Sequence, residues 1–382
     1  MLRIPNRFRM VKGDAIVNIM FVESFYGGSH KSFLDGLRKY SRHQITPITL
    51  PSRFWKWRLR SAALYIAEVY GAALRQCDLI VATDLINLAD LKALARFTCP
   101  AILFLHENQL TYPTPEGEKP ELNFGFTNLV SALTADRCLF NSQYHLQEFD
   151  SALKPFINDI PEFVPEGTRQ KIMAQSQVIY MGIDFSEFRH RPALHNAKPV
   201  ILWNHRWEFD KQPEVFFRQL YRLADAGFDF ELLLLGENFQ MHPKEFIEAR
   251  EKLGSRIRQY GYVESIYDYA RYLALADIVV STAMQENFGF AVVEAMYCHT
   301  LPLLPKRLSY PEILPEKFHE PFLYSTEEEL GGKLQKLLRD YRQLNEARAE
   351  IAQSMRQFDW KNRITEFDTL FDEMVIGFRR KA

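Results

Sequence analysis

The chain has 382 residues, of which 47% are hydrophobic and 25% are charged, and 47 basic residues against 48 acidic ones leave a net charge of −1. A chain of this length divides most naturally into two domains of roughly 150 to 190 residues. The near-neutral balance excludes a global attraction to nucleic acid or to acidic membranes, so any polyanion must be met by a local patch.

Cysteine use and hydrophobic runs bear on the compartment. Four scattered cysteines occur without a CxxC pair or a histidine cluster at metal spacing, namely Cys77, Cys99, Cys138 and Cys298. This pattern favours a reduced cytoplasmic compartment and argues against a structural zinc site. The basic start precedes an apolar run of strand length, far short of the roughly 20 residues that span a bilayer. We therefore expect a cytoplasmic protein without membrane insertion, either a monomer or a weak dimer.

The first predicted element is a strand at residues 16–22, followed by the loop ESFYGGSH and an amphipathic segment at 31–40. Strand, glycine loop and helix in this order open a βαβ unit. The loop lacks GxGxxG and GxxxxGK[ST], which excludes a dinucleotide fingerprint and a Walker loop. Gly27 and Gly28 either let a ligand approach the backbone or make a tight turn, and the local pattern does not choose between them.

Further strands alternate with helical segments along the first half of the chain. The predicted strands are HQITPITL (43–50), CDLIVAT (77–83), PAILFLHEN (100–108) and RCLFNS (137–142). This alternation predicts a parallel sheet covered on both faces. Because parallel sheets bind ligands beyond the carboxyl ends of their strands, we expect three polar loops to face one crevice. These loops are ESFYGGSH, HENQLTYP and NSQYH.

The composition shifts near residues 182–199, and a second alternating series of strands and helices begins at PVILWNH. The sequence therefore predicts two doubly wound domains that face each other across a cleft. A final helical segment from Trp360 is expected to pack back on the first domain. The predicted divisions are 1–185, 186–358 and 359–382.

The stretch STAMQENFGFAVVEAM (281–296) follows a predicted strand and opens into a helix. Free backbone N–H groups at such a helix start favour an anion, and we expect a diphosphate there. Glu286 lies in the loop and Glu294 in the helix, a pattern that is usually surface charge. Apolar neighbours make Glu294 a partly buried carboxylate that needs a hydrogen-bond donor. On one regular helix the two would lie about 12 Å apart, which argues against the carboxylate pair of a glycoside hydrolase.

These motifs together resemble the GT-B glycosyltransferases, specifically the retaining transferases of family 4. The resemblance rests on E-x7-E at Glu286 and Glu294, and on YMGIDFSEF, NHRWEFDKQP and FNSQYH. The N-terminal half is more specific, since FVESFYGGSHKSF, LPSRFWKWRLRSAALYIAE and FLHENQLTYP resemble the tRNA-queuosine α-mannosyltransferase family.

The resemblance implies a donor site on the second domain. Arg206 and Lys211 would bind the donor diphosphate, Glu286 the hexose hydroxyls and Glu294 the ribose. The remaining implied donor contacts are Gly27, Gly28, Asn287, Phe288, Gly289 and Phe290. His106 would lie beside the hexose, so the implied catalytic residues are His106, Arg206, Lys211 and Glu286. Taken alone, the Arg/Lys pair is more often a solvated pair, and a histidine after an apolar run is more often structural.

The resemblance also implies front-face substitution, in which the leaving phosphate helps to deprotonate the acceptor. No enzymatic nucleophile, metal or other cofactor is then expected, and the sequence has no DxD at a strand end. The only small-molecule partner expected is a nucleotide sugar.

The segment RFWKWRLR (53–60) combines four basic residues with three aromatic ones and no acid. Aromatic faces stack on bases and basic groups meet phosphates, although the segment also suits a helix start with Phe54, Trp55 and Trp57 partly in the core. The resemblance favours tRNA contact. The implied acceptor-binding residues are Ser29, His30, Arg53, Trp55, Trp57, Arg58, Glu107, Asn108, Gln109 and Tyr112. A basic tail with Arg3, Arg7, Arg9 and Lys12 would extend the patch or be a plain terminal tail.

The implied reaction is transfer of mannose from GDP-mannose to queuosine in a tRNA anticodon, of the tRNA-Asp type, with retention. Three alternatives remain open on the sequence alone. The acceptor could be a lipid or glycan with another nucleotide sugar, the chain could be a catalytically dead tRNA-binding protein, or it could be a sugar epimerase of the same fold.

Overall fold

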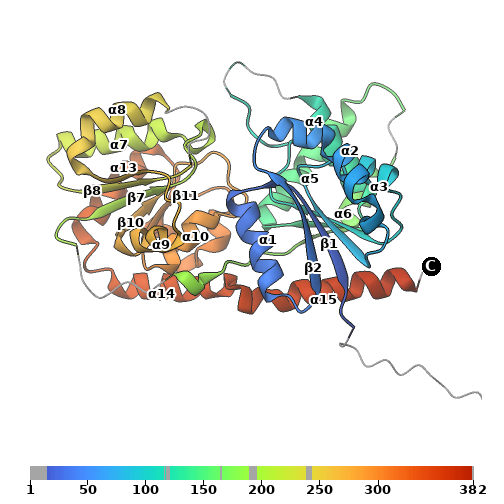
Figure 1. The fold of residues 1–382 in the computed structure, drawn as a ribbon. Coiled ribbons are helices and arrows are strands. Elements are labelled where there is room, and N and C mark those ends of the chain that lie inside the picture. The colour runs from blue at the N-terminus through green and yellow to red at the C-terminus, as the bar shows by residue number, and fades with distance from the viewer. Residues whose placement is uncertain are drawn as a thin grey trace, which may run out of the picture.

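The computed structural model describes residues 15–115, 117, 121–163, 166–188, 196–237 and 243–380. The basic tail with Arg3, Arg7, Arg9 and Lys12 lies outside these residues. Two α/β domains lie side by side, each built on a six-stranded sheet (Figure 1). All pairings between the strands are parallel, which confirms the prediction of two parallel α/β domains.

The N-terminal domain has the strand order β2-β1-β3-β4-β5-β6. Its strands are β1 (Asn18–Tyr26), β2 (Gln44–Pro51), β3 (Leu79–Thr83), β4 (Ala101–Leu105), β5 (Arg137–Phe140) and β6 (Ser176–Val178). Its helices are α1 (Gly28–Tyr40), α2 (Trp55–Leu74), α3 (Leu88–Ala95), α4 (Leu122–Thr134), α5 (Gln143–Asn158) and α6 (Thr168–Ala174). Every residue of β3 and β4 is buried, because helices cover both faces of the sheet.

The C-terminal domain has the order β12-β11-β10-β7-β8-β9. Its strands are β7 (Val200–Asn204), β8 (Glu231–Leu235), β9 (Ile257–Gly261), β10 (Ile278–Val280), β11 (Leu301–Pro305) and β12 (Leu323–Tyr324). Its helices are α7 (Pro213–Asp225), α8 (Lys244–Leu253), α9 (Ile266–Leu275), α10 (Phe290–Tyr297), α11 (Tyr310–Ile313), α12 (His319–Phe322), α13 (Glu327–Asp340) and α14 (Asn345–Met355). Short 3₁₀ turns lie at Phe185–Glu187, Phe209–Lys211, Gly254–Arg256, Glu316–Phe318 and Arg356–Phe358.

Each sheet has one point where the order of its strands reverses. In the N-terminal sheet this point lies between β1 and β3, and in the C-terminal sheet between β7 and β10. Ligands of open parallel sheets bind beyond the carboxyl ends of the strands at such points. At the domain boundary the loop after β10 meets the loop after β4, where the Asn287 side chain donates to the carbonyl of His106 at 3.1 Å.

Three elements differ from the sequence-based expectations. The pattern of residues 328–358 predicts one helical run, but the turn at residues 341–344 divides it into α13 and α14. The segment FTNLVSALTA predicts a helix from Phe126, but α4 begins four residues earlier, at Leu122. Helix α5 was not predicted, although its buried Phe149, Leu153 and Ile157 have helical spacing.

The last helix, α15 (Trp360–Arg379), runs along the base of the N-terminal domain (Figure 1). Trp360 is fully buried against α1, where a Cβ at Gly36 would lie 1.9 Å from the indole nitrogen. Asp368 accepts a hydrogen bond from the Ser41 hydroxyl at 2.6 Å. The end of the chain therefore packs on the first domain.

The chain crosses between the domains at two adjacent places. The N–H of Ile183 donates to the carbonyl of Phe358 at 2.7 Å, and the N–H of Trp360 donates to the carbonyl of Ile183 at 3.1 Å. The outgoing and returning segments thus run side by side and are hydrogen-bonded to each other.

Candidate active site

Lys211 lies in the 3₁₀ turn after β7 and is buried. Its Nζ donates to the carbonyl of Gln285 at 2.6 Å and lies 3.1 Å from Asp210 Oδ2 and 3.5 Å from Glu286 Oε2. Burial opposes the charge of the ammonium, but Asp210 and Glu286 outweigh it and raise the pKa of Lys211. The lysine is therefore a fixed cation.

Arg206, on the same loop, reaches across the domain boundary. One of its guanidinium nitrogens donates to the hydroxyl of Tyr112 at 3.3 Å, and another pairs with Glu208 at 3.2 Å. Arg206 also lies within electrostatic reach of Lys211. The structure thus brings together the two cations that the sequence predicted for a diphosphate, and Tyr112 from the predicted acceptor side.

The helix start at α10 differs in part from the expectation. The N–H of Gly289 is not free, because the Glu286 side chain folds back and accepts its hydrogen bond at 3.0 Å. The Gly289 N–H thus has a partner within the chain, and its contact with the donor stays a prediction. Within the described residues, the N–H groups of Asn287, Phe288 and Phe290 make no hydrogen bond. These three remain available to an anion.

Glu294 is buried in α10, as its apolar neighbours predicted. The donor that it needs is Tyr269, whose hydroxyl donates to Oε2 at 2.8 Å. Burial raises the pKa of Glu294 to about 8, and the bond from Tyr269 opposes that rise. Since a carboxylate accepts several hydrogen bonds, this contact leaves capacity for the hydroxyls of a ribose.

On the N-terminal side, His106 follows β4 and is buried. Its backbone N–H donates to Asp84 Oδ1 at 2.8 Å, while its backbone carbonyl accepts from the side chains of Asn141 and Asn287. Neither ring nitrogen has a hydrogen-bond partner within the described part of the chain. Burial, with His30 nearby, lowers the pKa of His106 well below its usual value, so the ring is neutral.

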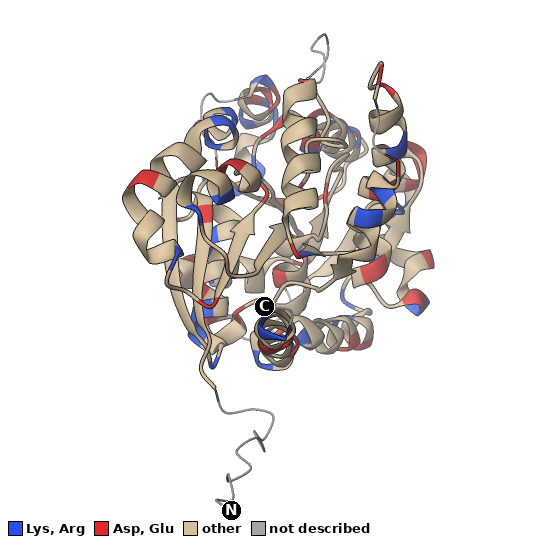
Figure 2. Cartoon of the chain, turned by 90° about the vertical axis from the view of Figure 1, so that its right-hand side faces the viewer, with Lys and Arg blue, Asp and Glu red and all other residues tan. Residues whose placement is uncertain are grey.

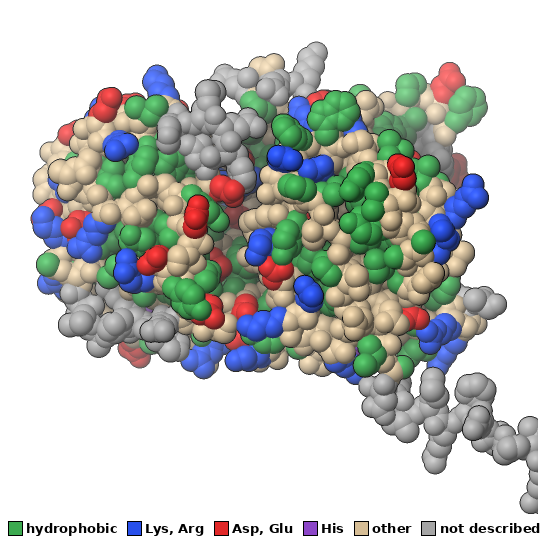
Figure 3. All heavy atoms as spheres, in the orientation of Figure 1, with side chains coloured by type: hydrophobic (Ala, Val, Ile, Leu, Met, Phe, Trp, Pro, Cys, Tyr) green, Lys and Arg blue, Asp and Glu red, His purple; other side chains and the backbone are tan. Residues whose placement is uncertain are grey.

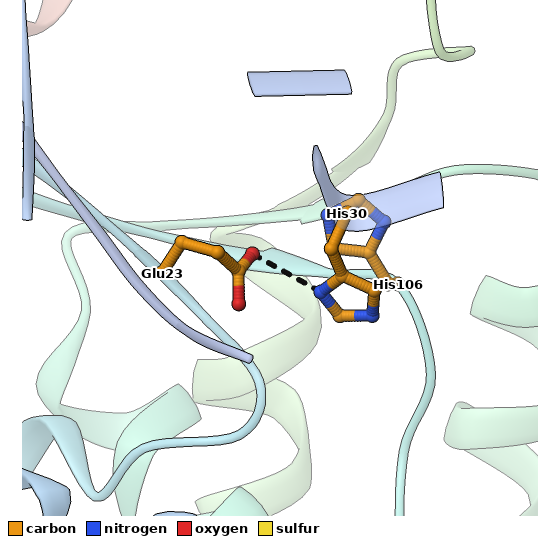
Figure 4. A group of neighbouring side chains, drawn as sticks. All are labelled: Glu23, His30 and His106. Carbon is orange, nitrogen blue, oxygen red and sulfur yellow. Dashed lines mark hydrogen bonds and ion pairs between the residues drawn. The ribbon is translucent and has the colours of Figure 1, made fainter. Parts of the chain in front are cut away.

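The ring of His106 stacks on that of His30, with centroids 3.9 Å apart (Figure 4). His30 Nδ1 lies 3.0 Å from Glu23 Oε2. Glu23 was not predicted as a site residue, although a glutamate at the end of a buried hydrophobic strand is the signal that marks it. The loops after β1, β4 and β5 therefore converge, as predicted from the strand order.

Two more carboxylates lie near this histidine pair. Burial raises the pKa of Asp84 to about 7, and it also raises the pKa of Glu107, against the attraction of Arg206 and His30. Asp84 was missed by the sequence reasoning, and its Oδ2 is buried without a partner in the described chain. Asn108 is fully buried, and its side chain accepts from the N–H groups of Leu110 and Thr111. It therefore shapes the loop, and its contact with the acceptor stays a prediction.

Four of the remaining predicted residues are explained at least in part by the fold or by neighbouring side chains. Gly28 has φ of +51°, which favours glycine, and a Cβ at Gly27 would lie 2.3 Å from the Ser52 hydroxyl oxygen. A turn and close packing thus account for the two glycines, and their contact with the donor stays a prediction. Ser29 is half-buried at the start of α1. Gln109 donates to Glu107 at 3.1 Å and so orders the loop after β4.

The basic and aromatic segment forms the start of α2. The side chains of Phe54 and Trp57 are 67% and 62% exposed, so the core interpretation is wrong for these two. It holds for Trp55, which is half-buried and packs on Phe124. Arg53 is exposed, whereas Arg58 donates to the carbonyl of Pro51 at 3.1 Å.

Part of the positive charge of this segment is balanced by one nearby carboxylate. Lys56 and Arg60 both pair with Glu121, at 2.8 and 2.6 Å. On the face seen in Figure 3, hydrophobic side chains and basic ones lie next to each other over the N-terminal domain. Elsewhere basic and acidic residues are interspersed, as the side view in Figure 2 shows.

Three side chains of the site are of types that commonly bind metal ions. The ligand atoms of Glu23, His30 and His106 lie within 4.8 Å of one another. The two rings, however, stack with an angle of 28° between their planes. A tetrahedral ion needs nitrogens that converge from different directions, and stacked rings do not present them.

No helix among the described residues has the length and apolar character needed to cross a bilayer. Two family models match the chain in succession. Residues 18–183 match the N-terminal model of the tRNA-queuosine alpha-mannosyltransferases, and residues 184–358 match the model of glycosyl transferases group 1.

Two relatives illustrate the range of similarity. The tRNA-queuosine alpha-mannosyltransferase of Drosophila melanogaster is 33% identical over 372 residues, which cover 94% of this chain and 97% of the relative. The GDP-mannose-dependent alpha-(1-6)-phosphatidylinositol dimannoside mannosyltransferase of Mycobacterium tuberculosis is 28% identical over 142 residues, which cover 35% of this chain and 36% of the relative.

Solved structures share the fold at low identity. HepE from Anabaena with bound UDP is 18% identical with a TM-score of 0.67, over 93% of this chain and 100% of that one. The sucrose-phosphate synthase from Thermosynechococcus elongatus is 16% identical with a TM-score of 0.73, over 94% and 100%. The fold is therefore the predicted GT-B arrangement of two facing domains. With a relative at 33% identity over nearly its full length, the chain belongs to the tRNA-queuosine alpha-mannosyltransferase family.

Proposed function

We propose that this protein transfers mannose from GDP-mannose to queuosine in a tRNA anticodon, of the tRNA-Asp type, and retains the α configuration. The observation that carries the proposal is the near full-length match to a tRNA-queuosine alpha-mannosyltransferase. The match of residues 18–183 to the N-terminal model of the same enzymes supports a tRNA acceptor. We place the reaction in the cytoplasm, where tRNA and nucleotide sugars are both present.

The site supports this chemistry through fixed charge. The diphosphate of the donor gains negative charge as the sugar leaves, and preorganised cations stabilise that charge. Lys211 and Arg206 lie at the carboxyl end of β7 with carboxylates as their present partners. A bound diphosphate would share these cations and receive the N–H groups of Asn287, Phe288 and Phe290. No metal is needed for this neutralisation.

The sugar and the nucleoside would lie on either side of the diphosphate. Glu286 would accept from the hexose hydroxyls, with the neutral ring of His106 on the opposite wall. Glu294 would accept from the ribose. The acceptor hydroxyl would pass its proton to the leaving phosphate, so no side chain has to act as a nucleophile.

The acceptor surface is the start of α2. Trp57 and Phe54 offer exposed aromatic faces for bases, and Arg53 offers a cation for phosphates. A lipid acceptor is the second candidate, and the partial similarity to a phosphatidylinositol dimannoside mannosyltransferase is the observation in its favour.

The test is incubation with GDP-mannose and queuosine-containing tRNA, followed by mass analysis of the nucleosides. We expect a hexose increment on queuosine alone. The matched control is the same tRNA with guanosine in place of queuosine, which should stay unmodified.

Two outcomes would contradict the proposal. If GDP-mannose stabilises the protein against heat but no increment forms, the acceptor is wrong, because a ligand that binds the native state reports an intact donor site. If tRNA binds and GDP-mannose does not, the protein is an inactive tRNA-binding member of the family.

A further inference from the structure

Glu23 is a fully buried carboxylate at the carboxyl end of β1. Its Oε1 accepts from the N–H of Phe25 at 2.8 Å and from the hydroxyl of Thr83 at 3.1 Å. Its Oε2 lies 3.0 Å from Nδ1 of His30 (Figure 4). Three contacts fix the position of this carboxylate, which in turn orients the His30 ring.

The orientation of His30 leaves one ring nitrogen for a ligand. Nδ1 faces Glu23, while Nε2 makes no hydrogen bond to any described residue. The side chain of His30 is 11% exposed, whereas Glu23 has no exposed side-chain surface. The ring therefore joins a buried carboxylate to the surface of the site.

The charged groups that face His30 come from three strands of the sheet. They are Glu23 on β1, Asp84 after β3 and Glu107 after β4, while the stacked ring of His106 is neutral. Burial lowers the pKa of His30, but these carboxylates outweigh burial and raise it to about 9. A protonated ring donates from both nitrogens, so Nε2 carries a hydrogen.

The surroundings indicate which ligand atom this hydrogen meets. Three carboxylates near one imidazolium repel an anion such as a diphosphate. Asp84 Oδ2 and both ring nitrogens of His106 are buried polar atoms without partners among the described residues. Unsatisfied buried groups of this kind mark a place where a ligand completes the hydrogen bonds. A hydroxyl both donates and accepts, so a neutral ring with adjacent hydroxyls matches this set.

We propose that Glu23 is a positioning residue that holds the His30 ring in an ion pair, and that Nε2–H of His30 donates to a hydroxyl oxygen of a neutral ring bound between the domains. Asp84 accepts from a neighbouring hydroxyl of the same ring. This inference rests on the proposed function and deepens it, because the ring is either the transferred hexose or the hydroxylated ring of the acceptor base.

The decisive variant is Glu23→Gln, which keeps the shape of the side chain and its hydrogen bond to Nδ1. Without the negative charge, His30 returns towards its ordinary pKa of 6.5. Because the amide oxygen keeps the bonds from Phe25 and Thr83, the amide nitrogen donates to Nδ1. Above that pH the neutral ring therefore keeps its hydrogen on Nε2, but as an uncharged and weaker donor. We expect kcat/KM of the variant, relative to wild type at the same pH, to be within about twofold at pH 6 and about tenfold lower at pH 8. The ratio cancels titrations that both proteins share.

The source of the ring follows from the substrate that is affected. A change confined to the KM for GDP-mannose, with slower donor hydrolysis in the absence of tRNA, assigns the hexose. A change confined to the KM for tRNA assigns the acceptor ring. The control is Asp35→Asn, which removes an exposed partner of Lys31 on α1 and should leave the ratio near one at every pH.

A second measurement does not depend on activity. The ¹⁵N shifts of the His30 ring, assigned with His30→Gln, should show an imidazolium at pH 8 in wild type and a neutral ring in Glu23→Gln. A neutral ring in wild type overturns the inference, and so does a loss in Glu23→Gln that is equal at all pH values. Stoichiometric zinc required for activity overturns it in favour of a metal centre. Absence of mannose transfer in wild type refutes the proposed function instead, and the ring shifts still decide the charge of His30.

Discussion

The two points of strand reversal use charge in opposite ways. After β7 and β10, the cations Arg206 and Lys211 are paired with carboxylates of their own domain. After β1, β3 and β4, three carboxylates face the His30 ring, and several buried atoms have no partner in the described chain. The first arrangement is already neutralised and exchanges partners when an anion binds. The second is complete only when a neutral polar ligand supplies hydrogen bonds.

The contrast predicts that changes on the C-terminal side affect chemistry most strongly. We expect Lys211→Ala to lower kcat by about 10² to 10³-fold, the cost of removing one preorganised group that stabilises transition-state charge. Binding of tRNA, measured by filter binding, should be unchanged.

The matched control for that variant is Lys198→Ala, which removes an exposed lysine paired with Asp229 at 2.9 Å. Its kcat should equal that of wild type. An equal loss of tRNA binding and of kcat in Lys211→Ala would contradict the division between donor and acceptor sides.

A buried cation outside the site tests whether the loss of kcat expected for Lys211→Ala would follow from breaking any buried ion pair. Arg348 pairs with Asp277 at 3.3 Å and donates to the carbonyl of His299 at 2.9 Å. We expect Arg348→Met to lower the free energy of unfolding by about 3 to 5 kcal/mol, because it removes the cation from a buried ion pair. Urea unfolding measures this change. The kcat per folded molecule should stay the same, and a reduced kcat would show that the distinction between site and structural cations is false.

The ionisation of Glu294 should make the affinity for the donor depend on pH. Its pKa of about 8 means that the carboxyl is largely protonated at pH 6.5 before a donor binds. Hydroxyls that donate to it favour the ionised form, so binding lowers its pKa and becomes tighter as the pH rises. We expect the Kd for GDP-mannose to fall about tenfold between pH 6.5 and 8.5. In Glu294→Gln, calorimetry should give weaker binding without this slope, and an unchanged slope would assign it to another group.

The smallest effect is expected on the acceptor surface. Loss of one exposed aromatic face costs about 1 kcal/mol or more of stacking on a base, so Trp57→Ala should weaken tRNA binding about fivefold. The KM for GDP-mannose should not change. Ile247→Ala removes an exposed apolar side chain from α8 of the other domain and serves as the control. Equal tRNA affinity in Trp57→Ala and wild type would remove α2 from the acceptor surface.

The sequence was sufficient to predict the two parallel sheets, because buried strands such as β4 are continuous apolar runs that helical segments separate. It also placed Arg206 and Lys211 together, since both follow one buried strand. It missed Glu23 and Asp84, because single acidic residues at strand ends look like surface charge. Their role in the site depends on contacts that the strand order creates. One example is the hydrogen bond from the backbone N–H of His106 to the carboxylate of Asp84, 22 residues earlier in the chain.

The sequence also did not reveal which side chains hydrogen-bond to the backbone. Glu286 caps the Gly289 N–H, and Asn108 closes its own turn. In both cases a polar side chain in a loop accepts a hydrogen bond from a nearby backbone N–H. The pattern of residue types indicates the presence of such groups, but the loop geometry decides which partner they take.

Helix α15 has a consequence for biosynthesis. The rings of Phe33 and Phe104 pack against Trp360 and Phe367, so the core of the N-terminal domain includes residues from the last part of the chain. Domains generally fold in the order in which the ribosome releases them. Here the domain that is translated first cannot close its core until the other domain has been made. Newly made chains therefore expose an apolar surface over α1 for most of translation, and a premature stop before residue 360 leaves both halves of the active site on a scaffold whose first half is unfinished.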